Sequence, residues 1–466
     1  MIVKLVSPDI PYLNDVQEIP RAFFPFLEIR NEAEHYLEWG CEHGENKFSC
    51  FINSDLWGKE TAELDIFEKD SLLYKKFTKR FLKNKLYKYL SENLQRTLPY
   101  GSLTGVRPTK LYYEISKEAD NPKEILMREF SVTASRAALI AECVDNQKGY
   151  KNDNENNVGI FVNIPFCPTR CTYCSFISTE IGRIRKQLPL YVDCILRELD
   201  FVTDWVAKSG KRVTSIYCGG GTPTSIDGDS LDKILRPLSN FNVEFTVEAG
   251  RPDCINEEIV SVLHNNKVSR ISINPQTFKQ STLELIGRKH TVEDIYRAYE
   301  LTRDKFDVNM DLIMGLPDEG TDDFRDSLLK AIDLSPQNVT VHALSLKKGS
   351  VMTTSGELKS SDGNVLSMSD MAHEILNAHN YKAYYMYRQK NSADNLENVG
   401  YCLDKKQCVY NIDMMEESES ILAVGAGAMS KIIKDDVIYR QHNPKGFNEY
   451  CARLEEIIES KKIFLS

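Results

Sequence analysis

Three cysteines stand within eight residues of the chain, directly after an apolar run that has the character of a β-strand. Cys167, Cys171 and Cys174 follow Ile160-Phe-Val-Asn-Ile-Pro-Phe166, and their spacing is C-x3-C-x2-C. A cubane iron–sulfur cluster takes one thiolate on each iron, so three thiolates without a fourth close in sequence leave one iron open. The spacing therefore predicts a [4Fe–4S] cluster whose open iron binds a cofactor or a substrate. A structural zinc loop is the alternative, and it requires a fourth ligand from elsewhere.

The chain around this loop alternates between strand-like and helical segments. Predicted strands cover 159–166, 213–218, 243–248, 269–273, 308–313 and 339–344, and predicted helices cover 188–207, 230–238, 256–264, 292–302 and 322–332. Six β-then-α units in order predict a parallel sheet covered by helices, with the chemistry at the carboxyl ends of the strands. We therefore expect the α/β fold class, as a partial (β/α)6 TIM-like barrel rather than a closed barrel of eight units.

Two further regions flank this segment. Residues 1–150 mix strand-like runs with a long helical stretch at 71–96, which predicts an N-terminal α+β domain, and the polar stretch 147–157 has the composition of a linker. Beyond residue 345 the alternation stops. The expected division is therefore 1–150, a barrel at 158–345, and a small C-terminal domain at 346–466 that closes the open side and covers the substrate.

The composition, with 42% hydrophobic and 27% charged residues, is typical of a soluble globular enzyme. No apolar run reaches the ~18 residues of a membrane helix and no signal pattern opens the chain, so we expect a cytoplasmic protein without a membrane span. The net charge of −10 disfavours a nucleic-acid binder. Basic residues crowd the helix at 71–96, which indicates a solvated amphipathic face or, alternatively, a surface for RNA or an acidic substrate.

Twelve cysteines in such a chain indicate one metal site plus reduced thiols rather than a disulfide framework. Cys41 with Cys50, or Cys402 with Cys408, are alternative candidates for pairing or for metal binding. A buried, unreactive thiol is the ordinary state of a free cysteine.

The predicted strands end in residues suited to binding a charged nucleoside. The second strand ends in Gly219-Gly-Gly-Thr222, where glycine lets a ligand approach the backbone closely. The third ends in Glu248, the fourth is followed by Gln276 and Arg288, and the fifth ends in a stretch that contains Asp311 and Ile313. Singly, each residue has an ordinary explanation as a turn, a helix cap, an exposed acid or a packing residue. Their order on consecutive strands favours a shared ligand with hydroxyl, amino and carboxylate groups.

These motifs together resemble the radical S-adenosylmethionine (radical SAM) superfamily and, within it, the oxygen-independent coproporphyrinogen III dehydrogenase (oxidase) family. The resemblance rests on Ile-Pro-Phe-Cys before the cluster, Gly-Gly-Gly-Thr-Pro-Thr, Gln-Thr-Phe with the later Gly-Arg, and Asp-Leu-Ile-Met-Gly-Leu-Pro. It is strong over 158–345 and weaker over 365–430, and residues 1–150 resemble a variant subgroup with an extra N-terminal domain. It implies that the three cysteines are the cluster ligands. The implied SAM contacts are Phe161, Tyr173, Gly220, Gly221, Thr222, Glu248, Gln276, Arg288, Asp311, Ile313 and Ala343.

The resemblance also implies a reaction. The cofactors would be a [4Fe–4S] cluster and SAM, the reductant flavodoxin or ferredoxin, and the substrate the tetrapyrrole coproporphyrinogen III. A radical derived from SAM would remove hydrogen from a propionate, and loss of CO₂ and one electron would leave a vinyl group, twice over, to give protoporphyrinogen IX in haem biosynthesis. No general acid or base is needed, so no catalytic side chain is named. Candidate cations for the propionates are Arg170, Arg183, Arg185, Lys186, Arg388 and Lys390.

Three positions depart from the pattern of that family. Phe176 stands where well-characterised dehydrogenases have a further cysteine, Phe161 where they have tyrosine, and Asn163 where they have histidine. Related haem chaperones share the Phe176 variant and keep the cluster and the cofactor. A haem chaperone on the same scaffold is therefore the main alternative, and a radical SAM methyltransferase or RNA-modifying enzyme is the third.

Overall fold

The computed structural model describes residues 2–5, 12–24, 28–29, 34–66, 72–152, 154–174, 179–345, 350, 352, 365–389, 395–435 and 437–466. The chain divides into two compact units. Unit 1 comprises Met1–Val144 with Asp394–Leu396, and unit 2 comprises Asp145–Ala393 with Glu397–Ser466. None of the helices in the described part of the chain has the length and hydropathy needed to cross a membrane.

Unit 1 contains a small mixed sheet in the order β2-β1-β3-β4-β5. Its strands are β1 (Ile2–Leu5), β2 (Glu28–Ile29), β3 (His35–His43), β4 (Lys47–Ser54) and β5 (Gly58–Asp65), and β3, β4 and β5 pair antiparallel. Every second residue of β4 is buried, as expected when one face of a sheet covers a core. The helices of this region are α1 (Leu13–Val16), α2 (Glu18–Phe23), α3 (Leu72–Leu94), α4 (Pro108–Ser116), α5 (Pro122–Phe130) and α6 (Ala134–Gln147).

The long basic helix α3 packs on that sheet and pairs much of its charge within unit 1. Its apolar side, which includes Leu86 and Leu90, shares a core with residues of β3 and β4. On the polar side, Arg80 Nη1 lies 2.7 Å from Glu129 Oε2. Lys76 and Lys79 form ion pairs with acidic residues of the same unit. This arrangement favours the solvated, internally paired face over a surface for RNA.

Unit 2 is built on an eleven-stranded sheet in the order β14-β15-β13-β12-β11-β10-β9-β6-β16-β17-β18. Its parallel part contains β6 (Asn157–Ile164), β9 (Arg212–Gly220), β10 (Glu244–Val247), β11 (Arg270–Gln276), β12 (Asp307–Met314) and β13 (Asn338–Ala343). These six strands pair in the order of the sequence, and each pair is parallel. The large, mostly parallel sheet of the predicted α/β class is thereby confirmed.

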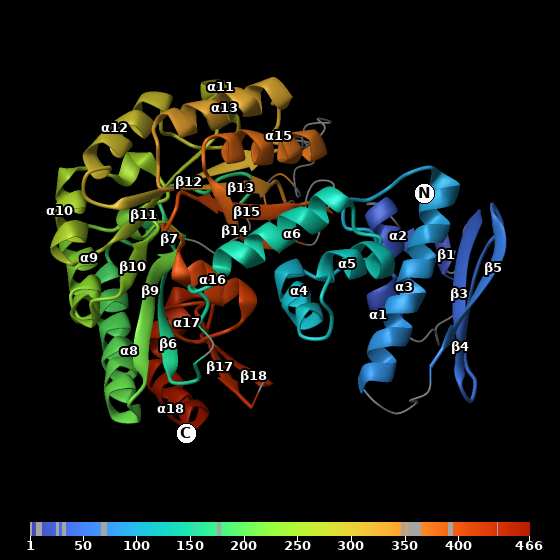
Figure 1. Ribbon diagram of the computed structural model, residues 1–466. Coiled ribbons are helices and arrows are strands. Elements are labelled where there is room, and N and C mark those ends of the chain that lie inside the picture. The colour runs from blue at the N-terminus through green and yellow to red at the C-terminus, as the bar shows by residue number, and fades with distance from the viewer. Residues whose placement is uncertain are drawn as a thin grey trace. The chain divides into compact units, whose positions relative to one another are not determined.

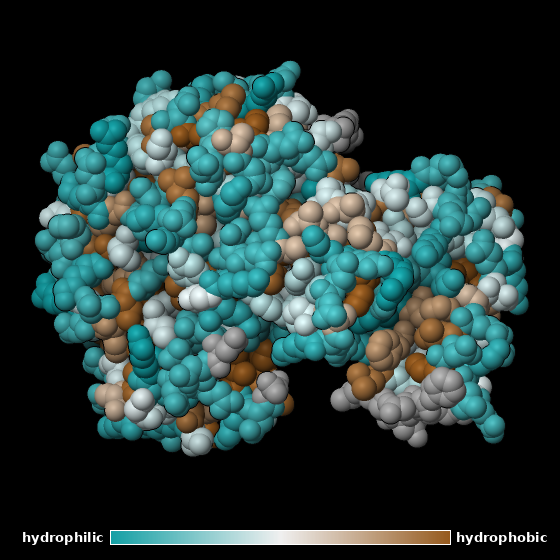
Figure 2. All heavy atoms as spheres, viewed as in Figure 1, coloured by the Kyte–Doolittle hydropathy of each residue, from teal (hydrophilic) through white to brown (hydrophobic). Residues whose placement is uncertain are grey.

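Helices follow the parallel strands and form an outer layer on the sheet (Figure 1). They are α8 (Leu188–Ser209), α9 (Gly228–Leu235), α10 (Glu257–Asn265), α11 (Gln280–Leu285), α12 (Val292–Thr302), α13 (Thr321–Asp333) and α15 (Val365–Ala378). Local signals fix their ends. Gly210 ends α8 at φ +69°, a left-handed conformation that suits glycine, and Thr291 with Asp294 forms a capping box at the start of α12. Hydrophilic residues dominate the visible outer surface of these helices (Figure 2).

Strands from beyond residue 345 extend both edges of the same sheet. On one side β15 (Glu397–Cys402) pairs antiparallel with β13, and β14 (Lys382–Arg388) pairs antiparallel with β15. On the other side β16 (Ser420–Val424) pairs parallel with β6, followed by β17 (Met429–Lys434) and β18 (Val437–His442). The remaining short elements are β7 (Phe166–Cys167), β8 (Thr179–Glu180), α7 (Ile181–Ile184), α16 (Val409–Glu416), α17 (Phe447–Ala452) and α18 (Leu454–Leu465).

The polar stretch 147–157, expected to be a linker, is held on unit 2 wherever the structure describes it. Gln147 is fully buried and its Nε2 donates to Glu416 Oε1 over 3.0 Å. Asn152 donates from both its backbone N–H and its Nδ2 to the carboxylate of Asp413, over 3.0 and 2.7 Å. The composition predicted a linker, and the local sequence could not show these contacts because the partners of the two amides lie more than 250 residues further along the chain.

Candidate functional site

The three-cysteine loop leaves the carboxyl end of β6 and is held by backbone hydrogen bonds on both sides. Cys171 is buried, and Cys167 and Cys174 are half-buried. The backbone N–H of Thr172, between the second and third cysteines, donates to Ile286 O over 3.0 Å. The loop is therefore fixed against the segment that follows β11, the same segment that carries Arg288.

The glycine motif after β9 packs against the chain that enters the cysteine loop. Gly221 N–H donates to Ile164 O over 2.9 Å, and Thr222 N–H donates to Phe166 O over 2.7 Å. A Cβ at Gly221 would lie 2.5 Å from Phe166 O, so a larger residue does not fit there. The Thr222 hydroxyl donates to Cys167 Sγ over 3.6 Å. The glycines were expected to let a ligand approach the backbone closely. In the structure, the missing side chain of Gly221 lets the backbone at Phe166 lie against it.

Glu248 lies directly after β10 and is held by an aromatic side chain. Tyr217 OH donates to Glu248 Oε1 over 2.6 Å. Burial, with the charge of Asp311 adding to it, raises the pKa of Glu248 to about 7 even though the Tyr217 hydrogen bond opposes the shift. Near neutral pH this carboxyl group therefore exists in both protonation states, and it can donate or accept a hydrogen bond.

Gln276 combines a strained backbone with an unsatisfied side chain. It ends β11 with φ +69°, a conformation that costs a non-glycine residue energy and often marks a functional position. Its side chain is buried, and among the described residues no partner reaches its Oε1. Asn274, two residues earlier, has a buried Oδ1 in the same condition. These two oxygens are acceptors that a polar ligand could use, and they lie near the buried Arg288, which donates to Asn274 O.

Arg288 is buried beside the cysteine loop. Its Nη1 donates to Asn274 O over 2.6 Å, and its Nη2 donates to Tyr173 OH over 3.2 Å. Its Nε has no partner among the described residues, and none of their carboxylates pairs with it within 4.0 Å. A guanidinium in this state is available to an anionic group of a ligand.

Asp311 lies within β12 and contacts polar side chains of the same strand and of β13. Asn309 Nδ2 donates to Asp311 Oδ1 over 2.7 Å, and His342 Nε2 lies 3.5 Å from Asp311 Oδ2. Burial acts against ionisation of Asp311, yet these groups and Thr340 outweigh it and hold the pKa of the carboxyl below its ordinary value. Asp311 is therefore an ionised acceptor at neutral pH.

The four remaining predicted contacts, Tyr173, Ile313, Ala343 and Phe161, have different surroundings. Ile313 and Tyr173 belong to one apolar cluster with Ile286. Ala343 is buried and its N–H donates to Asn398 Oδ1 over 3.0 Å. Phe161 instead packs with Tyr410 and Tyr217, at ring-centroid distances of 6.2 and 6.3 Å, and approaches Glu248 through Tyr217.

The candidate cations for the substrate are scattered. Arg170, Arg185 and Lys186 are exposed, and Arg183 pairs with Glu180 over 3.1 Å. Arg388 is half-buried at the end of β14, in register with the buried Glu397 of β15. Lys390 lies outside the described residues, and so does Phe176.

Several residues near the loop were not foreseen. Arg251 and Asp253 lie shortly after Glu248, and Arg251 Nη1 donates to Thr169 Oγ1 inside the cysteine loop over 3.0 Å. Burial, with the charges of Asp253 and the Cys167 thiol adding to it, raises the pKa of the Cys254 thiol to about 12. The sequence signal was available, because Arg-Pro-Asp-Cys follows Glu248 by two residues, but charged residues after a strand are too common to single out.

The described residues contain no group of three His, Cys, Asp or Glu side chains that converge on a single metal ion. A cubane cluster places its thiolates on separate irons, so its ligands surround a volume rather than one point. The thiolate chemistry of the loop, the buried unpartnered oxygens of Asn274 and Gln276 and the free Nε of Arg288 fit a cluster with a polar organic cofactor beside it.

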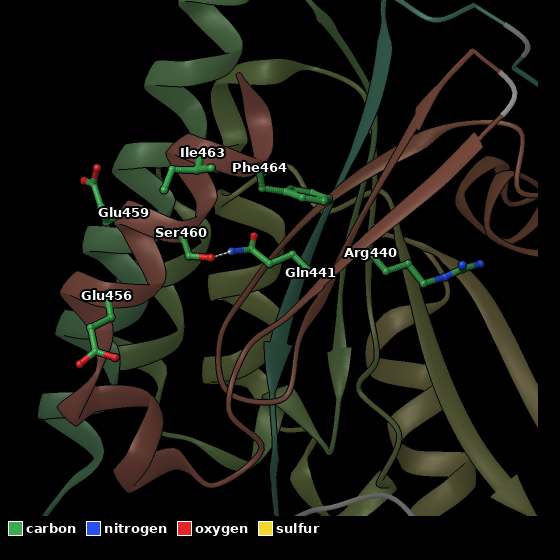
Figure 3. Close-up of a pocket in the computed structure, with 7 residues that line it drawn as sticks. All are labelled: Arg440, Gln441, Glu456, Glu459, Ser460, Ile463 and Phe464. Atoms are coloured by element: carbon green, nitrogen blue, oxygen red, sulfur yellow. Dashed lines mark hydrogen bonds between the residues drawn. The ribbon is translucent and has the colours of Figure 1, made fainter.

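A separate hollow lies between β18 and α18 (Figure 3). Its volume is about 600 Å³, and Gln441 Nε2 donates to Ser460 Oγ across it over 2.7 Å. Its lining residues are Arg440, Gln441, Glu456, Glu459, Ser460, Ile463 and Phe464. None of the residues predicted for the site lies there.

Comparison with known proteins defines the class first. Residues 162–331 match the family model described as the radical SAM superfamily, which implies a [4Fe–4S] cluster and SAM. A solved structure of coproporphyrinogen III oxidase (HemN) from Escherichia coli has a TM-score of 0.53 over 69% of this chain and 72% of that chain. At 20% sequence identity, that likeness supports the fold alone.

Sequence relatives then define the family. The chain is 39% identical over 389 residues to HemZ of Bacillus subtilis (strain 168), described as an oxygen-independent coproporphyrinogen-III oxidase-like protein. The match covers 79% of this chain and 77% of HemZ. The heme chaperone HemW of Escherichia coli (strain K12) is 27% identical over 304 residues, which are 62% of this chain and 75% of HemW. The chain belongs to the oxygen-independent coproporphyrinogen III oxidase-like family of the radical SAM superfamily.

Proposed function

We propose that this protein is an oxygen-independent coproporphyrinogen III dehydrogenase. It would convert two propionate groups of coproporphyrinogen III to vinyl groups, giving protoporphyrinogen IX. One observation supports this activity above the others: buried polar groups without partners gather beside the three-cysteine loop, in a chain related to an oxygen-independent coproporphyrinogen-III oxidase-like protein.

The chain's own residues would hold the cofactors at the ends of the parallel strands. When bound, the cluster and SAM together supply an organic radical that removes a hydrogen atom. Cys167, Cys171 and Cys174 provide the thiolates. Arg288 is suited to the carboxylate of the methionine part, and Asp311 accepts hydrogen bonds from hydroxyl groups.

The remaining predicted contacts complete the proposed SAM site. Gln276 would accept a hydrogen bond at its unpartnered Oε1. Because the pKa of Glu248 is about 7, its carboxyl group could accept a hydrogen bond from an amino group or donate one to a hydroxyl group. The apolar pair Ile313 and Tyr173 would cover a flat base and keep water away from the radical. We also propose that residues 158–345 form a partial six-unit barrel around the cofactors and that residues 346–466 cover the substrate.

The substrate's propionates require cationic partners. Arg388 is the strongest candidate because it is half-buried at the end of β14, on a strand that also carries Tyr384, Tyr385 and Tyr387. Substitution of Arg388 by Met should raise the KM for coproporphyrinogen without changing cleavage of SAM in the absence of substrate. Lys382, at the exposed start of the same strand, provides the matched control.

An anaerobic assay tests the activity. Protein reconstituted with iron and sulfide is incubated with coproporphyrinogen III, SAM and a chemical reductant, and the products are oxidised and separated. We expect a monovinyl intermediate and then protoporphyrin, with formation of 5′-deoxyadenosine. Cleavage of SAM without any vinyl product would reject the proposal.

A haem chaperone is the second candidate, supported by the relationship to HemW. It predicts haem bound at one equivalent per chain, measured by the Soret band after gel filtration. Haem binding together with absence of vinyl product would favour the chaperone.

A further inference from the structure

The buried Arg251 forms an ion pair with Asp253, which lies at the protein surface, and the proposed reaction assigns no role to this pair. They follow β10 and stand just beyond Glu248. Arg251 Nε lies 2.9 Å from Asp253 Oδ1 and Arg251 Nη2 lies 2.9 Å from Asp253 Oδ2, so the pair is bidentate. The Arg251 side chain is 3% exposed and that of Asp253 is 28% exposed. Bidentate pairs of this kind are geometrically specific and hold the guanidinium in one orientation.

The remaining nitrogen of the Arg251 guanidinium, Nη1, contacts the cysteine loop. Arg251 Nη1 donates to Thr169 Oγ1 over 3.0 Å, and Thr169 lies between Cys167 and Cys171. The Thr169 hydroxyl in turn donates to Gly287 O over 3.5 Å. Thr169 is therefore held between two segments that come from different strands of the sheet.

The two buried arginines next to the loop differ in whether a carboxylate pairs with them. Arg251 is balanced by Asp253, whereas Arg288 is buried and no carboxylate among the described residues lies within ion-pair distance of it. His290 is fully buried, and burial together with the charges of Arg288 and Arg251 lowers its pKa to about 3, so it is neutral. Arg251, Arg288 and Asp253 together contribute one net positive charge beside the loop, and Arg170, which is exposed within the loop, is a further cation.

We infer that Arg251 and Asp253 are positioning residues that hold the cysteine loop through Thr169 and set the reduction potential of the cluster it binds. The inference rests on the proposed function, because it requires the cluster on Cys167, Cys171 and Cys174. Reduction adds one negative charge to the cluster, so a nearby positive charge favours the reduced state and a negative charge opposes it.

The two members of the pair should act in opposite directions. Arg251→Gln leaves the Asp253 carboxylate uncompensated, which cancels the positive charge of Arg288 and lowers the potential. Asp253→Asn leaves Arg251 uncompensated and raises the potential. We expect about a tenfold change in the ratio of reduced to oxidised cluster at a fixed potential in each variant, equivalent to about 59 mV for a one-electron couple. Disruption of the fold alone would not shift the two variants in opposite directions.

The measurement is a potentiometric titration of the reconstituted full-length protein, followed by the EPR signal of the reduced cluster in the absence of SAM. Arg236→Gln is the matched control, because Arg236 is exposed on the same unit and pairs with Asp232. We expect Arg236→Gln to keep the wild-type potential. A folded Arg251→Gln with an unchanged or raised potential overturns the inference.

Two further arms keep the inference testable if Arg251→Gln does not fold. Asp253→Asn must then raise the potential by itself, and an unchanged or lowered value overturns the inference. Thr169→Val removes the hydroxyl that Arg251 binds, so this variant should lose iron to a chelator several-fold faster than wild type. Thr169→Ser keeps the hydroxyl and should lose iron at the wild-type rate. Equal rates in all three proteins would overturn the inference that Arg251 holds the cysteine loop through Thr169. Wild-type protein that takes up no cluster would reject the proposed function itself.

Discussion

The buried ion pair between Glu198 and Lys461 allows a sharp test of what holds the carboxyl-terminal helix on the sheet. Glu198 of α8 is fully buried, and its Oε1 lies 3.1 Å from Lys461 Nζ of α18. Glu198 Oε2 also accepts from Tyr450 OH over 2.6 Å and from Gly425 N–H over 2.8 Å. Lys461 Nζ donates further to Ser430 Oγ over 3.1 Å. Both charges are therefore fully committed to partners inside the protein.

Lys461→Met removes the ammonium but keeps an unbranched chain of similar length. Glu198 then remains buried without its counter-charge, and breaking a buried pair in this way typically costs about 3–5 kcal/mol. We expect the free energy of unfolding of unit 2 to fall by that amount. In the double variant with Glu198→Gln, no charge is left unpaired, so its cost should be about 1–3 kcal/mol smaller than the sum of the two single costs.

Hydrogen exchange followed by mass spectrometry as urea is increased measures this effect locally, which matters because a chain of two units need not unfold in one step. The peptides to follow cover β16, β17 and α18. Lys462→Met is the matched control, since the adjacent Lys462 is 54% exposed and its ion pair with Glu459 is a surface pair worth at most about 1 kcal/mol. If Lys461→Met and Lys462→Met cost the same, the reasoning from burial is refuted.

Three shorter predictions concern the site. Cys171→Ala should abolish the broad absorbance near roughly 400 nm after reconstitution, whereas Cys451→Ser on α17 should retain it; full iron content in Cys171→Ala contradicts the ligand assignment. The raised pKa of Glu248 means that the folded state keeps a proton that the unfolded state releases, so stability falls as pH rises from about 4.3 to about 7, by up to about 3 kcal/mol. Urea unfolding at several pH values should show this loss in wild type and not in Glu248→Gln, and parallel pH profiles would disprove it. Gly221→Ala should weaken SAM binding in equilibrium dialysis at least tenfold, because its Cβ would collide with the backbone before the cysteine loop; Gly446→Ala, with open space around it, should bind as wild type does, and equal affinities would show that the motif tolerates a side chain.

Much of the sheet could be predicted from the sequence because each parallel strand is a short apolar run followed by an amphipathic helix. The helix expected at 188–207 is α8, Leu188–Ser209, and the predicted order of six parallel strands is the observed one. Strands β15 and β18 were not predicted, for a physical reason. All six residues of β15 are buried, so no alternation marks it, whereas β18 is largely exposed and lacks an apolar side. Their place depends on partners far along the chain.

The candidate site divides in the same way. Residues at strand ends, such as Glu248 and Gln276, could be singled out because the end of a predicted strand in the sequence is also its end in the fold. Asn274 and Arg251 could not, because their importance comes from what faces them across strands. The assignment of the eleven SAM contacts stays a prediction, and the structure adds partners and burial to it rather than a test.

Asn163 stands where well-characterised dehydrogenases of the family have histidine, and it packs against two glycines that are distant from it in the sequence. Its Nδ2 donates to Ala426 O, and a Cβ at Gly220 would overlap its Oδ1. A Cβ at Gly425 would lie 2.3 Å from Asn163 O, and Tyr191 OH donates to that same oxygen over 2.7 Å. Because Glu198 in turn accepts a hydrogen bond from Gly425 and pairs with Lys461, the glycine motif after β9, strand β6 and the carboxyl-terminal helix are linked through Asn163. A larger ring at position 163 would displace both glycine turns at once, so we expect Asn163→His to require compensating changes near 426 before SAM binding recovers.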